Sequence, residues 1–283
     1  MKSKTLPVLA LGLVLLMSAC AAQNTAVTPD TPGTPDAASV TPADTPSTAA
    51  TPEEDTKTLA YANYANAMSQ ITAAPGGEDV QIDMDMDMRM NMSMLDQNIA
   101  VNSNGNIKTI VEDGKTKFSS VINTESDYGS NTIEMLYDGE KMYYAVDGVE
   151  TELDASAFEQ QMGSTVNMPE FGIDAIKSFE TADVPEGKKT TFVIDGTKMT
   201  GYIMEAAGEE MALLGDIGDI TMEDMTIEVV TAENGDPVSV GIQMAVAVSA
   251  ESIEDITMDM SMKFTINQIG SGVVIDTSKL ETV

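Results

Sequence analysis

The stretch Ile82–Met94 reads IDMDMDMRMNMSM, and it decides the fold. Each of its even-numbered residues is isoleucine or methionine, and each odd-numbered residue is polar. Successive side chains of a β-strand point to opposite faces of its sheet, so this alternation predicts one strand with an apolar face and a polar face. At roughly 3.3 Å per residue the strand is about 40 Å long. A helix is excluded, because a period of two would scatter the methionines around it.

Asn-Gly and Asp-Gly dipeptides recur after this strand. Such dipeptides supply the positive φ angles of tight hairpin turns, so their spacing predicts an antiparallel meander. The clearest case is the stretch 133–149, IEMLYDGEKMYYAVDGV, in which strands and turns alternate. The six dipeptides are Asn104-Gly105, Asp113-Gly114, Asp138-Gly139, Asp147-Gly148, Asp195-Gly196 and Asn234-Gly235.

Further strands are predicted toward the end of the chain, where Ile256–Ile266 reads ITMDMSMKFTI and repeats the opening pattern. Altogether the alternating segments predict about nine to eleven strands. The other predicted strands here are Thr190–Ile194, Met225–Val229, Val238–Val248 and a short last strand at Val273–Ile275.

Four segments have apolar residues at helical spacing: 57–72, 154–162, 173–179 and 197–214. A sheet with one apolar face must bury that face, and a wide twisted sheet tends to curl. The predicted fold class is therefore α+β: a mainly antiparallel, strongly curved β-sheet, or half-barrel, with two or three helices covering its apolar face.

The first twenty residues have the pattern of a targeting segment. Lys2 and Lys4 precede a short apolar run, Leu6–Leu16, which is too short to span a bilayer as a mature helix. The following Met-Ser-Ala-Cys, ending at Cys20, resembles a bacterial lipobox, whose cysteine is diacylated and becomes the new N-terminus. We therefore expect residues 1–20 to be a lipoprotein signal peptide and Cys20 to be the lipidation site. An ordinary secretory signal is the alternative.

Composition divides the rest of the chain into a tether at 21–55 and a β-rich domain at 56–283. The tether is rich in Thr, Pro and Ala and has no residues that could build a core, so we expect it to be disordered. The formal charge of −32 argues against nucleic acid as a partner. The expected location is the extracytoplasmic side of the cell membrane, where two acyl chains on Cys20 give stable anchoring.

The order of these features resembles the LolA/LppX-like lipoprotein superfamily. The shared features are the lipobox, the tether, a helix, a very long first strand, a DG-rich meander that includes YDGEKMYYAVDG, a helical insertion and long closing strands. The resemblance covers roughly residues 56–283. It implies an incomplete β-barrel that is plugged by helices and that often encloses an apolar cavity for lipids or acyl chains.

The methionine faces are the candidate ligand site. Strands normally favour branched and aromatic residues, whereas methionine gives a soft surface that adapts to varied apolar ligands. A filled core that is simply rich in methionine is the main alternative, and copper(I) binding by thioethers is a weaker one. The ligand-cavity candidates are Met84, Met86, Met88, Met90, Met92, Met258, Met260, Met262 and Phe264.

Metal and catalytic motifs are not recognisable. Asp83, Asp85 and Asp87 imitate the start of a calcium loop, but Met88 and Met94 occupy its glycine and glutamate positions. The chain has no histidine, which excludes a Ser-His-Asp triad. We therefore expect no cofactor, no metal and no enzymatic activity.

Two functions are compatible with these residues. The first is a membrane-anchored binding protein that holds a lipid or other apolar ligand. The second is a structural or protein-interaction lipoprotein that has a filled core and no ligand.

Overall fold

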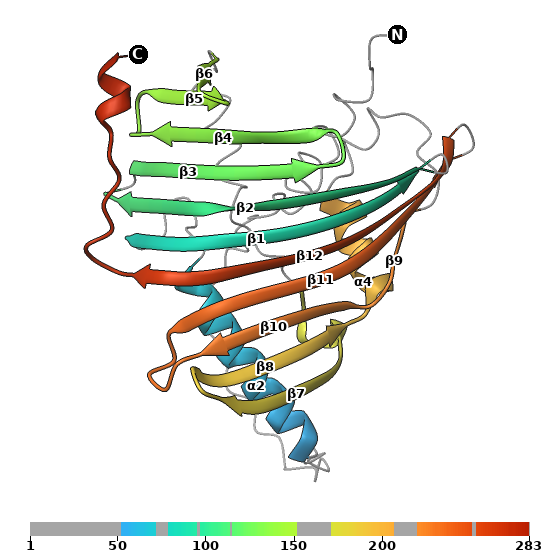
Figure 1. Cartoon of the computed structure of the whole chain (residues 1–283). Coiled ribbons are helices and arrows are strands. Elements are labelled where there is room, and N and C mark those ends of the chain that lie inside the picture. The colour runs from blue at the N-terminus through green and yellow to red at the C-terminus, as the bar shows by residue number, and fades with distance from the viewer. Residues whose placement is uncertain are drawn as a thin grey trace, which may run out of the picture.

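The strands of the computed structural model form one antiparallel sheet (Figure 1). Within the residues that the structure describes, the sheet has 12 strands, curves strongly (Figure 1) and is accompanied by two α-helices, which confirms the predicted fold class. The residues that the structure describes are 52–71, 79–94, 97–113, 115–151, 171–206, 220–250 and 253–282.

Strand β1 (Val80–Met94) lies at the centre of the sheet, between β2 (Gln97–Glu112) and β12 (Ile253–Ile269). The first and last strands of the domain therefore pair with each other. Beyond β2 follow β3 (Lys115–Ser126), β4 (Gly129–Tyr137), β5 (Met142–Val146) and β6 (Val149–Glu150). Beyond β12 follow β11 (Pro237–Ala250), β10 (Met225–Thr231), β8 (Gly187–Ile194) and β7 (Ile176–Val184), while β9 (Ile220–Met222) pairs with one end of β11.

Helices α2 (Pro52–Ser69) and α4 (Gly196–Ala206) lie on the same side of the sheet (Figure 1). Helix α2 starts at Pro52 rather than at Lys57, since proline is tolerated in the first turn of a helix. Its buried residues Tyr64, Ala67 and Met68 recur at intervals of three and four, and they join the largest core cluster. No described helix combines the length and the apolar character that crossing a membrane requires.

We call the face of the sheet that carries the even-numbered side chains of β1 the inner face. Ile82 and Met84 on this face share the core cluster with Tyr64 of α2, so the helix covers this side. The register places Met88 opposite Met262 and Met90 opposite Met260. The predicted strand, its alternation and its apolar face are all present.

The opposite, outer face holds the aspartates of β1. Asp83 lies opposite Lys108, and Asp83 Oδ2 is 3.2 Å from Lys108 Nζ. Asn106 Nδ2 donates to Asp83 Oδ1 at 2.7 Å and to Asp85 Oδ1 at 3.0 Å. Partial burial raises the pKa of Asp83, but the hydrogen bonds from Asn106, Asn267 and Lys108 outweigh it, so the pKa lies below its ordinary value. This face therefore relieves its charge by pairing across strands.

The C-terminal segment also lies against the outer face. Gln81 Oε1 accepts hydrogen bonds from the backbone N–H groups of Gly272 and Val273, at 2.9 and 3.2 Å. Lys141 Nζ donates to the carbonyl oxygen of Leu280 at 3.2 Å, and Lys279 pairs with Glu134. The predicted strand at Val273–Ile275 is therefore wrong. This segment has no regular structure before the 3₁₀ turn η2 (Ser278–Thr282), because side chains rather than a strand ladder hold it.

The predicted hairpin turns are largely confirmed. Strands β4 and β5 meet at Asp138-Gly139, β5 and β6 at Asp147-Gly148, and β10 and β11 at Asn234-Gly235. Asp113 has a φ of 50° between β2 and β3, as a tight turn requires.

Two of the predicted turns are wrong. Asn104-Gly105 lies inside β2, where it pairs with both β1 and β3. Asp195-Gly196 begins α4 instead of a hairpin, since Asp195 Oδ1 accepts from the backbone N–H of Thr197 at 2.9 Å and caps the helix.

The helix predicted at 173–179 is also largely wrong. A 3₁₀ turn, η1 (Ile173–Ala175), is followed directly by β7. A register shift between Ile176 and Ser178 in its pairing with β8 interrupts the alternation of side chains, and this produced the misleading helical spacing. The helix predicted at 154–162 and the part of the 197–214 helix beyond Ala206 lie outside the described residues.

Candidate functional site

The nine ligand-cavity candidates come together on the inner face of two adjacent strands, β1 and β12. Opposite one another lie Met86 and Phe264, Met88 and Met262, Met90 and Met260, and Met92 and Met258. The buried members are Met84, Met88, Met90, Met260 and Phe264. The others, Met86, Met92, Met258 and Met262, are only partly buried.

This arrangement forms a continuous apolar surface in which four flexible thioether side chains keep part of their surface accessible. Methionine is unbranched and polarisable, so such a surface can adjust to the shape of an apolar partner. Cys20, the expected lipidation site, lies outside the described residues.

A polar row continues the inner face from the methionines into β2, β3 and β4. Ser103 lies opposite Met88, Thr124 lies opposite Ser103, and Asn131 lies opposite Thr124. The hydroxyls of Ser103 and Thr124 are 3.0 Å apart and form a hydrogen bond. The sequence did not predict this polar row, because the three consecutive polar residues 102–104 obscure the alternation of β2.

Two hydroxyls of the inner face have no partner within the described part of the chain. Thr109 is 3% exposed and Ser120 is 1% exposed, yet neither Thr109 Oγ1 nor Ser120 Oγ has a hydrogen-bond partner there. Asn131 Oδ1 is likewise buried without one. Buried polar groups are normally hydrogen-bonded, so these atoms require a physical explanation.

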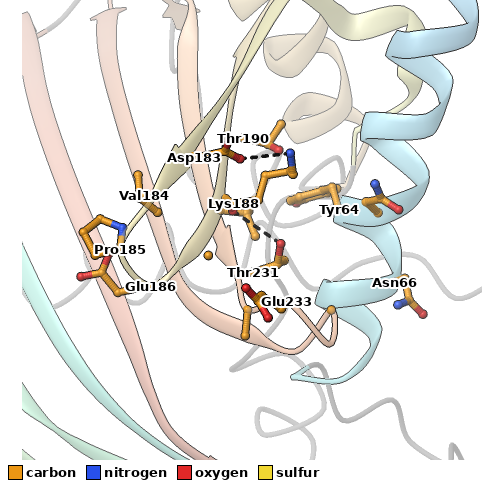
Figure 2. A pocket seen from close by; sticks show the side chains of 15 residues that line it. Tyr64, Asn66, Asp183, Val184, Pro185, Glu186, Lys188, Thr190, Thr231 and Glu233 are labelled. Atoms are coloured by element: carbon orange, nitrogen blue, oxygen red, sulfur yellow. Dashed lines mark hydrogen bonds and ion pairs between the residues drawn. The ribbon is translucent and has the colours of Figure 1, made fainter.

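A separate cleft opens between α2 and the tips of the β7–β8 and β10–β11 hairpins (Figure 2). Its volume is about 680 Å³. Tyr64 contributes to its wall and also packs in the core, where its ring is 5.1 Å from that of Phe171. The lining residues are Asn63, Tyr64, Asn66, Asp183, Val184, Pro185, Glu186, Gly187, Lys188, Thr190, Val229, Thr231, Ala232, Glu233 and Gly235.

The lining of the cleft mixes polar and apolar groups, and its charged residues are on balance acidic. Lys188 Nζ is 3.3 Å from Asp183 Oδ1, while Glu186 and Glu233 add two further carboxylates (Figure 2). Its amides, hydroxyls and carboxylates suit it to hydrogen bonding. None of the nine methionine-face candidates lines it. Sequence reasoning missed this cleft because its walls come from three distant segments without a shared motif.

Ion pairs fix the region around α4. Lys177 on β7 donates to both carboxylate oxygens of Asp224 at 2.8 Å, and this hydrogen bonding raises the pKa of Lys177 and lowers that of Asp224. Lys198 Nζ lies 2.7 Å from Asp174 Oδ2, and the pKa of Asp174 is lowered for the same reason. In the described ranges, no group of three or more Asp, Glu, His or Cys side chains is placed to hold a metal ion.

Comparison with known proteins gave structural likenesses only, since no protein-family model and no curated protein matches the sequence. A lipovitellin structure matches with a TM-score of 0.30 and 7% identity, over 71% of this chain and 26% of the lipovitellin chain. A DUF1329 family protein from Desulfovibrio piger matches with a TM-score of 0.26 and 10% identity, over 81% of this chain and 99% of that chain. A dehydratase from the difficidin assembly line follows with a TM-score of 0.14 and 9% identity, over 75% and 84% of the two chains. None of these matches shows a family for the chain.

Proposed function

We propose that this protein is a non-catalytic lipoprotein, anchored to the outside of a cell membrane through Cys20, that holds a lipid or other apolar ligand. The observation that carries the proposal is the methionine surface on β1 and β12. Its nine members are contiguous, and Met86, Met92, Met258 and Met262 are incompletely buried.

A filled core accounts less well for this surface. Met262 lies in the middle of a central strand pair, where a closely packed core would bury it as fully as its neighbour Met88. Methionine also specifies one fixed packing poorly, which is a disadvantage in a rigid core and an advantage against variable acyl chains. In the proposed complex the ligand lies along the inner face, and the methionine side chains of β1 and β12 contact its hydrocarbon part.

We expect Met262→Asp to weaken the binding of diphenylhexatriene, a neutral hydrocarbon dye, by at least about tenfold in the full-length chain. A carboxylate in an apolar site costs more than about 1.4 kcal/mol of binding free energy, which corresponds to that factor. Because Met262 is partly buried, the domain should stay folded. Dye fluorescence measures binding and circular dichroism checks the fold.

Ser261→Asp is the matched control for this variant, since Ser261 is the exposed outer-face neighbour and lies opposite Arg89. It should leave dye binding unchanged. Absence of dye binding in the wild type, after removal of copurifying lipid with detergent, would favour the filled-core alternative instead.

Anchoring is tested separately by Cys20→Ala. Without the acylated cysteine the protein should move from the membrane fraction to the soluble fraction, because two acyl chains are what make such anchoring stable. Metabolic labelling with radioactive palmitate, followed by fractionation, measures both effects. A wild type that takes up no label would contradict the lipobox assignment.

A further inference from the structure

We propose that the methionine surface of β1 and β12 is a reversible modification site. Two-electron oxidants such as hydrogen peroxide convert four of its methionines to methionine sulfoxide and thereby change the surface from apolar to polar. The chain has 22 methionines and one cysteine, so thioethers are its most numerous oxidisable sulfur groups. This modification acts on the surface itself and does not require a bound ligand. The four residues are Met86, Met92, Met258 and Met262.

The methionines of β1 differ in accessibility along the strand. Met88 and Met90 are buried, at 8% and 3% exposed, and they lie between the partly buried Met86 and Met92. Oxidation of a thioether depends on how accessible it is, so an oxidant reaches the two partly buried residues before the two buried ones.

Strand β12 repeats this arrangement beside β1. The buried Met260 lies between the partly buried Met258 and Met262. Met258 lies directly opposite Met92, and Met262 lies diagonally across from Met86. We call the four partly buried residues the flanking methionines, and the three buried residues between them the middle methionines. The flanking methionines therefore form two neighbouring pairs, one on each side of the middle methionines.

The modification is an oxygen transfer that a reductase can reverse. The lone pair of the thioether sulfur attacks one peroxide oxygen, so that an S–O bond forms and the O–O bond breaks. The departing hydroxide takes the proton of the transferred oxygen and leaves as water. The sulfur is oxidised by two electrons and the peroxide is reduced by two. A methionine sulfoxide reductase removes the oxygen as water, using two electrons from a dithiol that becomes a disulfide.

The surroundings of the flanking methionines make a sulfoxide disruptive. Met262 lies between Met88 and Ile242, and Met258 lies between Met92 and Val246. These register partners are all apolar, so their side chains offer no hydrogen bond to a sulfoxide oxygen. A polar oxygen there must take its hydrogen bonds from water. Oxidation of the flanking methionines therefore brings water beside the middle methionines and makes them accessible in turn.

The first test treats the full-length chain, freed of copurifying lipid, with hydrogen peroxide at pH 7. Mass spectrometry of its peptides follows the added oxygen at each methionine. The flanking methionines should oxidise at least about ten times faster than the middle methionines, which should follow only afterwards. The melting temperature should fall by at least about 5 °C once the flanking methionines are oxidised, since each sulfoxide weakens an apolar contact.

Replacement of all four flanking methionines with leucine should protect the surface. Leucine roughly conserves volume and cannot form a sulfoxide, so peroxide should leave the melting temperature of this variant unchanged. Met135→Leu is the matched control, because Met135 is partly buried on β4 outside the surface, and this variant should lose stability as the wild type does. The milder variant Met92→Leu/Met258→Leu should still slow the oxidation of Met90 and Met260.

Reversal separates a modification site from simple damage. Methionine sulfoxide reductases A and B act on the two sulfoxide epimers, and together with dithiothreitol they should remove the oxygen from the flanking methionines and restore the melting temperature. Equal oxidation rates for flanking and middle methionines, an unchanged melting temperature, or sulfoxides that resist both reductases would overturn the inference. None of these results affects diphenylhexatriene binding by the unoxidised chain, so the proposed function fails or stands separately.

Discussion

Replacing Met88 with aspartate is expected to lower the free energy of unfolding by several kcal/mol at pH 7. The Met88 side chain is 8% exposed, and its register partners are Met262 on β12 and Ser103 on β2. Both nearby basic groups, Arg89 and Lys263, lie on the outer face. An ionised carboxylate at this position loses its hydration and finds no counter-ion among the described residues, which costs several kcal/mol.

The loss should depend on pH in a definite direction. Burial raises the pKa of the introduced carboxyl above its unfolded value of about 3.9. The penalty is therefore present in full above the raised folded pKa, and it declines as the pH falls toward the unfolded value. Urea unfolding of the variant and the wild type at pH 7 and at pH 5 measures the difference, which should be smaller at pH 5.

Ser93→Asp provides the control, because Ser93 is exposed on the outer face of the same strand. Surface substitutions of this kind usually change stability by less than about 0.5 kcal/mol. Equal losses for the two variants would contradict the burial of Met88 and would mean that water reaches the centre of the methionine surface.

The sheet was predictable where one physical signal is strong. The 13 residues from Ile82 to Met94 alternate without exception, so the strand, its two faces and its central importance follow from period two alone. Ile256–Ile266 has the same signal, and the two stretches are paired in the structure. That pairing itself was not predicted, because partner choice between distant strands depends on the whole topology.

The functional details were less predictable because they depend on contacts between segments far apart in the sequence. Thr109 and Ser120 have no distinguishing pattern in the sequence. Only the pairing of β2 with β3 shows that they lie diagonally across from each other on the inner face. The cleft beside Tyr64 similarly combines one helix with two hairpin tips. Neither arrangement has a local motif, so no window of the sequence indicates it.

Asn104-Gly105 shows how a strong local signal can be overruled. The dipeptide is typical of a hairpin turn, yet it sits in the middle of β2, with β1 on one side and β3 on the other. The glycine is needed for a different reason. A Cβ atom at Gly105 would lie 2.2 Å from the carbonyl oxygen of Val121 on β3. Glycine inside a strand often marks such a close approach of two backbones.

Gly105→Ala is therefore expected to destabilise the protein by at least about 2 kcal/mol, within the range of overpacking in a well-packed interior. The neighbouring atom belongs to the backbone of β3, so no side-chain rotation can relieve the contact, and β2 and β3 must separate locally. Urea unfolding at pH 7 measures the loss.

Gly201→Ala is the matched control, since Gly201 is exposed on α4 and a Cβ atom there would meet nothing within 4 Å. Alanine has a higher helix propensity than glycine, so this variant should gain up to about 1 kcal/mol. Replacing glycine with alanine is thus expected to lower the free energy of unfolding at position 105 and to raise it at position 201. If Gly105→Ala were as harmless as Gly201→Ala, the close contact between β2 and β3 would be absent in solution. In that case Asn104-Gly105 would form the hairpin turn that its sequence predicts, instead of lying inside the continuous strand β2.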